Sequence, residues 1–200
     1  MDKDQQPAMT ATDKKFINIA SEPLNKVFQW TDQGHHVALA TVIETWGSAP
    51  RPKGSFLVIR DDGKFDGSVS GGCVEGDVIA HADEVIKTAQ AKLLTYGVTN
   101  DDAWSLGLAC GGKISILLEP VGDDLMTYLK LASHFDQSRT AYAFIQDPNI
   151  GTIGLEEYQA NQPILVDDSH FVNLIQPAKR LYIVGAVHIA KHLAPLAKQT

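Results

Sequence analysis

The sequence predicts a mixed α/β (α+β) fold in which helices flank a sheet that is mixed or mostly antiparallel. Short segments rich in β-branched and other apolar residues alternate with segments whose apolar residues recur at helical spacing. The turn sequence Asp61-Asp62-Gly63, between two strand-like segments, is typical of a β-hairpin. With 200 residues, 44% hydrophobic and 20% charged, the chain is globular in composition and can bury a sizeable core.

The N-terminal third is expected to begin with a polar tail and a helix. Residues 1–13 are polar and are predicted to be disordered. Apolar residues at helical spacing predict a helix over 14–33, which Pro23 divides near its middle and which Gly34 ends. Strands are then expected over residues 36–43, 55–60 and 65–69.

The middle of the chain continues this alternation. A helix is predicted directly after Cys73, because apolar residues from Val74 to Ala89 repeat at helical spacing. A further helix is expected over 123–134, within an irregular connecting segment of about 122–178. One domain is therefore expected to span residues 14–178, with strands at 92–96, 113–119, 140–146, 152–155, 163–166 and 171–175.

The last residues, 179–200, have a different character. An apolar strand is predicted over 180–184, followed by the turn Gly185-Ala186-Val187 and a helix over 187–197. This order is that of the opening of a nucleotide-binding βαβ unit. No second strand follows, so we expect an incomplete Rossmann βα unit that needs a partner to cover both faces of its strand.

Charge and cysteine content exclude several classes of function. The net charge of −7, from 17 Lys and Arg against 24 Asp and Glu, argues against broad binding to nucleic acid. No apolar segment is long enough for a membrane span, and the polar start predicts no signal peptide. Two cysteines without a secretion signal predict a cytoplasmic protein with free thiols.

The first cysteine lies in a glycine-rich turn, residues 70–77, at a strand-to-helix junction. Glycine lets a ligand approach the main chain, and the unpaired amides at a helix start can bind an anion or activate a thiol. Glu75 and Asp77 in the first helical turn partly oppose that effect. The alternative interpretation is a tight turn around a buried, inert cysteine. The candidate residues here are Gly71, Gly72 and Cys73.

The second cysteine lies in a similar turn, residues 106–112, just before a strand. Its candidate residues are Cys110, Gly111 and Gly112, in a loop that suits a phosphate or a flat cofactor. The paired spacings of a structural zinc site are absent. Whether the two cysteines are close in space is not determined by the sequence.

A proline-rich loop, residues 46–55, contributes two basic side chains. Arg51 can bind a phosphate through two hydrogen bonds, and Lys53 can add a point charge. The prolines would order this loop in advance and so reduce the entropy lost on binding. The alternative is an ordinary surface loop with solvated charges.

Taken together, these stretches resemble the XdhC/CoxI family of xanthine dehydrogenase accessory proteins. The matching segments are 38–53 (ALATVIETWGSAPRPK), 67–78 (GSVSGGCVEGDV) and 106–112 (LGLACGG), and the resemblance returns at 180–197. It implies a chaperone that binds the molybdenum cofactor, assists its sulfuration and inserts it into a xanthine dehydrogenase-type molybdenum hydroxylase. The resemblance also implies that the molybdenum hydroxylase and a cysteine desulfurase are partners of this protein, and that the protein forms a homodimer.

The resemblance suggests roles for the candidate residues. Cys73 and Cys110 would contact the molybdenum, with Gly71, Gly72, Gly111 and Gly112 admitting the pterin, and Arg51 with Lys53 would hold the phosphate. NAD(P) is not expected, because Val187 stands where the nucleotide-binding motif has its middle glycine. Two alternatives to a non-catalytic accessory protein stay open. They are a thiol-dependent oxidoreductase or sulfur transferase, and a scaffold that binds a client without cofactor.

Overall fold

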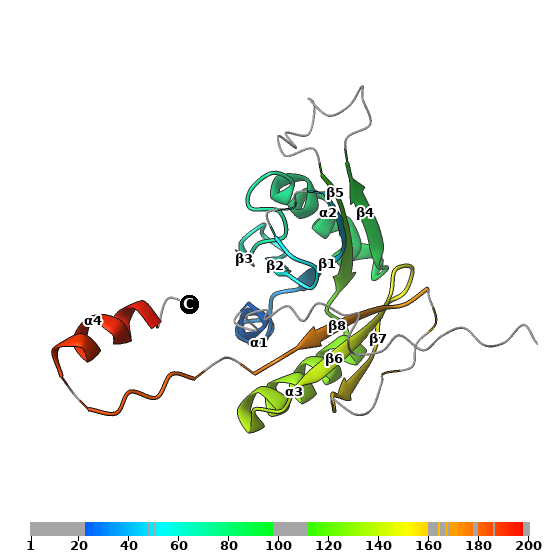
Figure 1. Ribbon diagram of the computed structural model, residues 1–200. Coiled ribbons are helices and arrows are strands. Elements are labelled where there is room, and N and C mark those ends of the chain that lie inside the picture. The colour runs from blue at the N-terminus through cyan, green and yellow to red at the C-terminus, as the bar shows by residue number, and fades with distance from the viewer. Residues whose placement is uncertain are drawn as a thin grey trace, which may run out of the picture.

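The computed structural model describes residues 23–47, 49, 51–97, 112–159, 164, 167, 169–177, 180–185 and 187–197. The chain runs through two antiparallel sheets with helices packed against them, and α4 stands apart from both sheets (Figure 1). The elements are α1 (Leu24–Asp32), β1 (Val37–Trp46), β2 (Phe56–Arg60), β3 (Phe65–Gly67), α2 (Glu75–Thr88), β4 (Lys92–Tyr96), β5 (Lys113–Pro120), α3 (Asp123–Ser138), β6 (Tyr142–Asp147), β7 (Gly151–Glu157), β8 (Phe171–Ile175) and α4 (His188–Ala197).

The larger sheet has the order β3-β2-β1-β5-β4, and every neighbouring pair is antiparallel. The predicted hairpin is confirmed, because β2 and β3 pair across the turn that contains Gly63 at φ +82°. The positive φ is one that glycine adopts without strain. β1 lies at the centre of the sheet and pairs with β5, which is far away in sequence. The mixed α/β prediction is confirmed, with the sheet antiparallel throughout.

The smaller sheet has the order β7-β6-β8, and α3 packs on it. This part of the chain is more regular than the irregular connecting segment that the sequence predicts. β8 has the predicted bounds, whereas the strand expected at 163–166 lies mostly outside the described residues. The first helix begins directly after Pro23, and the part of the predicted helix before that residue is not described.

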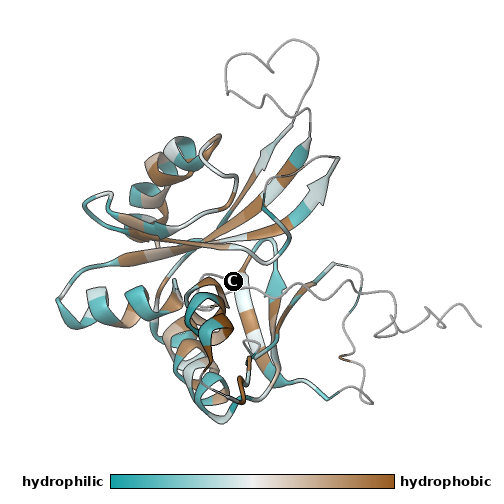
Figure 2. Cartoon of the chain, turned by 60° about the vertical axis from the view of Figure 1, so that its left-hand side comes forward, coloured by the Kyte–Doolittle hydropathy of each residue, from teal (hydrophilic) through white to brown (hydrophobic). Residues whose placement is uncertain are grey.

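The larger sheet carries a separate apolar core on each face (Figure 2). On one face, Val78, Ala82 and Val85 of α2 pack against strand residues such as Ile116. On the other, α1, α3 and the smaller sheet cover it. That second core contains Val27, Leu39, Phe56, Leu125, Leu129 and Phe144. Fully burying one side chain of this size stabilises the fold by about 1.5–3 kcal/mol.

The strand predicted over 180–184 does not form in the structure. Residues 180–185 lie outside any helix or strand, with Tyr182 and Val184 78% and 99% exposed. A strand needs neighbouring backbone to pair its amide and carbonyl groups, and none lies beside this segment in the described chain. The helix predicted after it is confirmed as α4, which has no buried residue. Among the helices that the structure describes, none is long and apolar enough to cross a membrane.

A buried polar cluster joins the two sheets. Glu119, only 3% exposed, accepts hydrogen bonds from the backbone amide and hydroxyl of Thr152 and from Nε2 of Gln146 at 3.1 Å. Burial raises the pKa of Glu119, and the hydrogen bonds from Thr152 and Gln146 only partly oppose this. Oε1 of Gln146 is buried without a hydrogen-bond partner.

We expect Glu119 to make the free energy of unfolding depend on pH in the range above 4.5, the ordinary pKa of a glutamate side chain. Because its folded-state pKa is raised, the folded protein binds this proton more tightly than the unfolded chain does. Stability therefore rises as the pH falls through the folded-state pKa towards 4.5. The unfolding temperature, measured from pH 8 to pH 5, should therefore rise in the natural protein relative to the Glu119→Gln variant. A difference between the two proteins that stays constant with pH would contradict it.

Candidate functional site

The Cys73 turn, residues 68–75, connects β3 to the start of α2. Gly71 and Gly72 adopt φ values of +80° and +110°, which disfavour residues with a side chain. A Cβ added at Gly72 would meet no atom within 4 Å, so the backbone angle and not crowding selects glycine there. Cys73 is a free, exposed thiol. The alternative prediction that this cysteine is buried is therefore wrong.

The inside of this turn is filled by the carboxylate of Glu75. Backbone amides of Val69, Ser70, Gly71 and Gly72 donate to it, at N–O distances between 2.8 and 3.1 Å. The hydroxyl groups of Ser68 and Ser70 also donate to it. The sequence suggested that Glu75 weakens anion binding by the turn. In the structure Glu75 is itself the anion that the turn binds.

The environment of Glu75 favours its charged form. Burial leaves the residue 7% exposed and would by itself raise the pKa of its carboxyl group. Hydrogen bonds from Ser70 and Ser68 outweigh burial and lower the pKa of Glu75 to about 2. The carboxylate is therefore charged at neutral pH, with its oxygens fully engaged by the turn.

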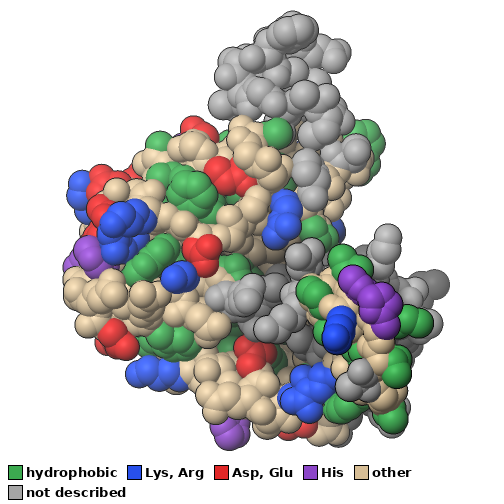
Figure 3. Space-filling model, turned by 90° about the vertical axis from the view of Figure 1, so that its left-hand side faces the viewer, with side chains coloured by type: hydrophobic (Ala, Val, Ile, Leu, Met, Phe, Trp, Pro, Cys, Tyr) green, Lys and Arg blue, Asp and Glu red, His purple; other side chains and the backbone are tan. Residues whose placement is uncertain are grey.

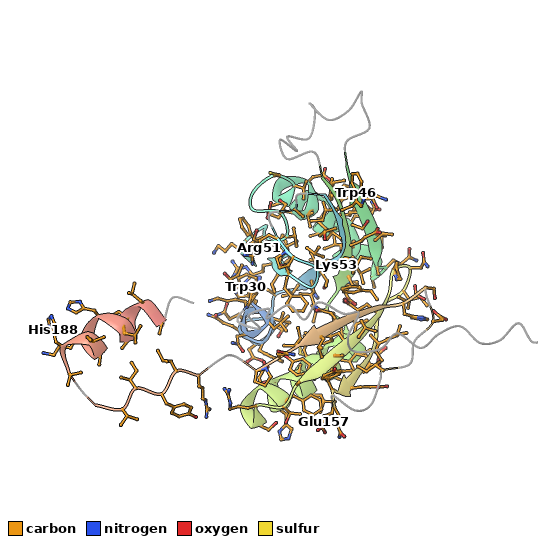
Figure 4. All side chains as sticks on the ribbon, viewed as in Figure 1. Trp30, Trp46, Arg51, Lys53, Glu157 and His188 are labelled. Carbon is orange, nitrogen blue, oxygen red and sulfur yellow. The ribbon has the colours of Figure 1, made fainter. Side chains whose placement is uncertain are left out.

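Arg51 lies beside the same turn. Its Nε donates to the backbone carbonyl of Ser68 at 3.3 Å. Figure 4 labels Arg51 and, on the same loop, Lys53. The loop that carries Arg51 and Lys53 is fixed on β1 and on the smaller sheet: the amide of Gly54 donates to the carbonyl of Val42, and Nδ2 of Asn173 donates to the carbonyl of Gly54. Arg51 and Lys53 are both exposed. The structure thus brings Arg51 to the Cys73 turn and presents Lys53 on the same ordered loop.

Of the second cysteine turn, residues 106–112, the structure describes only the last residue. Cys110 and Gly111 lie outside the described residues, and Gly112 is buried directly before β5. Tyr96, at the end of β4, pairs with Ile114 of β5 and donates its hydroxyl to Asp77 of α2 at 2.7 Å. The start of α2 and both ends of the segment that contains Cys110 therefore lie at one end of this sheet.

Two residues at this end of the sheet were not selected from the sequence. Trp46 is 72% exposed at the end of β1 and pairs in register with Lys113. Tyr96 is buried, and burial together with the Asp77 carboxylate raises its pKa. Tyr96 ends a strand that the sequence predicts, whereas Trp46 lies beyond the strand predicted over 36–43 and in the predicted loop. Only the pairing of β1 and β4 with β5 brings both residues to this end of the sheet.

The face of the molecule shown in Figure 3 has no single dominant charge. Figure 3 shows Lys and Arg side chains interspersed with Asp, Glu and apolar side chains on one face of the molecule. This face carries no continuous basic stripe of the kind that nucleic acid binding needs. Within the described part of the chain, no group of three or more His, Cys, Asp or Glu side chains is placed to hold a metal ion.

The chain is similar in sequence to several known proteins. Residues 30–97 match the XdhC and CoxI family. The molybdenum cofactor insertion chaperone PaoD of Escherichia coli is 32% identical over 117 residues, which are 58% of this chain and 34% of that protein. A protein of Bacillus subtilis named as a probable xanthine dehydrogenase subunit is 32% identical over 85 residues, 42% of this chain and 26% of that protein. The matches thus span about a third or less of these relatives.

A solved structure shares the fold. A crystal structure from Bacillus halodurans, described as a xanthine dehydrogenase, superposes with a TM-score of 0.71 at 23% identity. The match covers 88% of this chain and 59% of that one. The fold is therefore common to both proteins, and the family match includes the Arg51 loop and the Cys73 turn. Residues 30–97 of this chain are thus similar in sequence to the XdhC and CoxI family.

Proposed function

We propose that this chain acts in molybdenum cofactor maturation, as a chaperone that binds the cofactor and inserts it into a xanthine dehydrogenase-type molybdenum hydroxylase. The observation that carries the proposal is the exposed Cys73 thiol, held on an ordered turn directly beside Arg51. The relationship to a molybdenum cofactor insertion chaperone supports it.

The residues of the site fit the chemistry of this cofactor. Cys73 offers a soft sulfur ligand to molybdenum, and Cys110 is proposed as a second one. Glu75 occupies the four turn amides, so we assign binding of the cofactor phosphate to Arg51 and Lys53. The open space at Gly72 suits the approach of a flat pterin, and we assign the same role to Gly71, Gly111 and Gly112.

The proposal extends to partners and to the longer protein. It includes assistance in the sulfuration of the cofactor, with a cysteine desulfurase as the sulfur donor, and a cytoplasmic homodimer as the working unit. The exposed apolar side chains of residues 181–196 support association with further protein surface. We propose residues 179–200 as the start of a second, Rossmann-like domain, without NAD(P) binding by this chain alone.

Cofactor retention tests the proposed function. The full chain is purified from cells that make molybdopterin, and bound molybdenum and released pterin are assayed. Replacing Cys73 with alanine should reduce retention at least about tenfold, because changing even groups that merely orient metal ligands costs about 10–100-fold. Cys110→Ala should act in the same direction. Lys64→Ala, which removes an exposed lysine of the β2–β3 turn, is the control.

The same experiment separates the other candidate functions. Equal retention in the natural protein and in the double cysteine variant would contradict a thiol-lined cofactor site. Client binding that survives in that variant would then support a scaffold. Turnover of a thiol substrate without a client protein would support an oxidoreductase or sulfur transferase.

A further inference from the structure

We propose that Glu75 is the positioning residue of the Cys73 turn, and that its carboxylate is a built-in anion that holds the thiol on the outside. The role of Cys73 in binding a cofactor rests on the proposed function. The ordering of residues 68–75 by Glu75 does not depend on it.

The carboxylate organises the turn through both of its oxygens. Oε1 accepts from the Ser68 hydroxyl at 2.7 Å and from the amides of Val69, Ser70 and Gly71 at 3.1, 2.9 and 3.1 Å. Oε2 accepts from the Gly72 amide at 2.8 Å and from the Ser70 hydroxyl. Hydrogen bonds to a charged carboxylate are roughly twice as strong as neutral ones. Four successive amides thus converge on one side chain.

This arrangement exceeds what capping of α2 requires. In a capping box, the acidic side chain in the first helical turn receives one backbone amide, that of the residue just before the helix. Val74 holds that position here and provides no side-chain cap. The amides that Glu75 binds all precede Cys73 instead. Its interactions therefore order the glycine-rich segment and not merely the end of the helix.

The packing of its two neighbours leaves the Cys73 side chain room only on the solvent side of the turn. On one side, the amide of Gly72 is bound to Oε2 of Glu75. On the other, Val74 is 2% exposed in the core beneath α2, and its amide donates to the Ser70 hydroxyl at 2.9 Å. The interior between these anchors is filled by the carboxylate. An exposed thiol follows from this packing.

Arg51 is connected to the Glu75 carboxylate through Ser68. The Nε of Arg51 donates to the backbone carbonyl of Ser68, and the hydroxyl of Ser68 donates to Glu75. Loss of the carboxylate would therefore loosen both the thiol and the neighbouring guanidinium. The carboxylate also keeps an external phosphate away from the turn amides, so Arg51 is the group beside this turn that can still bind an anion.

Anion rescue tests this role. Glu75→Ala is made in a Cys110→Ala background, so that Cys73 is the remaining thiol. Hydrogen exchange of amides 69–72 and the rate of Cys73 alkylation are measured with rising formate, against chloride at equal ionic strength. Without formate, we expect exchange protection to fall at least about tenfold. Alkylation should slow at least about threefold as the thiol turns into the vacated space. Formate should reverse both effects saturably.

Control variants complete the experiment. Asp83→Ala removes an exposed α2 carboxylate that pairs with Lys87, and amides 69–72 should stay protected. Glu75→Gln keeps the size of the side chain and provides the test if Glu75→Ala does not fold. It should lose protection at the amides that faced one oxygen, and formate should not restore it.

The outcomes distinguish this inference from the proposed function. Amides 69–72 that stay protected in Glu75→Ala or in Glu75→Gln would overturn the positioning role, as would a loss that formate does not reverse in Glu75→Ala. If formate rescues Glu75→Ala but the natural protein retains no cofactor, the positioning role of Glu75 is supported. Only the proposed cofactor binding is then contradicted.

Discussion

Replacing Phe144 with alanine is expected to lower the free energy of unfolding by about 3–5 kcal/mol. Phe144 of β6 is 2% exposed and packs edge-to-face with Phe56 of β2, with ring centroids 6.2 Å apart. It makes a similar contact with Tyr142 at 5.8 Å. The side chain therefore joins the two sheets, and its removal leaves a cavity that the surrounding strands can fill only in part.

Urea unfolding at pH 7 measures this effect, and Phe65→Ala is the matched control. Phe65 is 51% exposed in β3, so its removal should change stability by less than about 1 kcal/mol. The smaller sheet also supports the Arg51 loop through Asn173, so the Phe144 variant should weaken cofactor retention as well. A loss below about 1 kcal/mol for Phe144→Ala would show that the sheets do not pack through this ring.

Glu75 is expected to contribute about 3 kcal/mol of stability at neutral pH and to lose it in acid. The pKa of Glu75 is lowered from 4.5 to about 2 by the turn. The folded protein therefore binds this proton less readily than the unfolded chain. The contribution is complete above pH 4.5 and falls as the pH drops towards 2, which is the opposite sign to Glu119.

Denaturant unfolding between pH 7 and pH 2.5 measures this contribution. The natural protein should lose stability over this range relative to Glu75→Gln, whose side chain does not titrate. The Glu119 effect lies at higher pH, so a Glu119→Gln background separates the two carboxyl groups. Parallel pH profiles for the natural protein and the Glu75 variant would contradict the lowered pKa.

Much of the fold follows from local pattern. The hairpin at Asp61-Asp62-Gly63, the helix after Cys73 and the strand over 171–175 all lie where the sequence predicts them. Each depends on neighbours within a few residues: turn chemistry, helical spacing or β-branched content. The Gly-Cys motif likewise predicted a tight turn before this helix, because positive φ angles at Gly71 and Gly72 are a local requirement.

The site needed information that local pattern does not contain. The approach of Arg51 to Ser68, the pairing of β1 with β5 and the contact of Tyr96 with Asp77 join residues distant in sequence. The predicted strand over 180–184 shows the same limit, since an apolar segment forms a strand only where other backbone pairs with it.

The sequence by itself predicted the order of the elements from β1 to α3 and the two glycine-rich cysteine turns, and it carries the similarity to the XdhC and CoxI family. Only the tertiary structure decided that Glu75, and not an external phosphate, occupies the turn amides of Val69–Gly72. The physical reason is that a carboxylate beside unpaired amides has the same sequence signature whether it repels a ligand or replaces one. The distances between its oxygens and those amides distinguish the two.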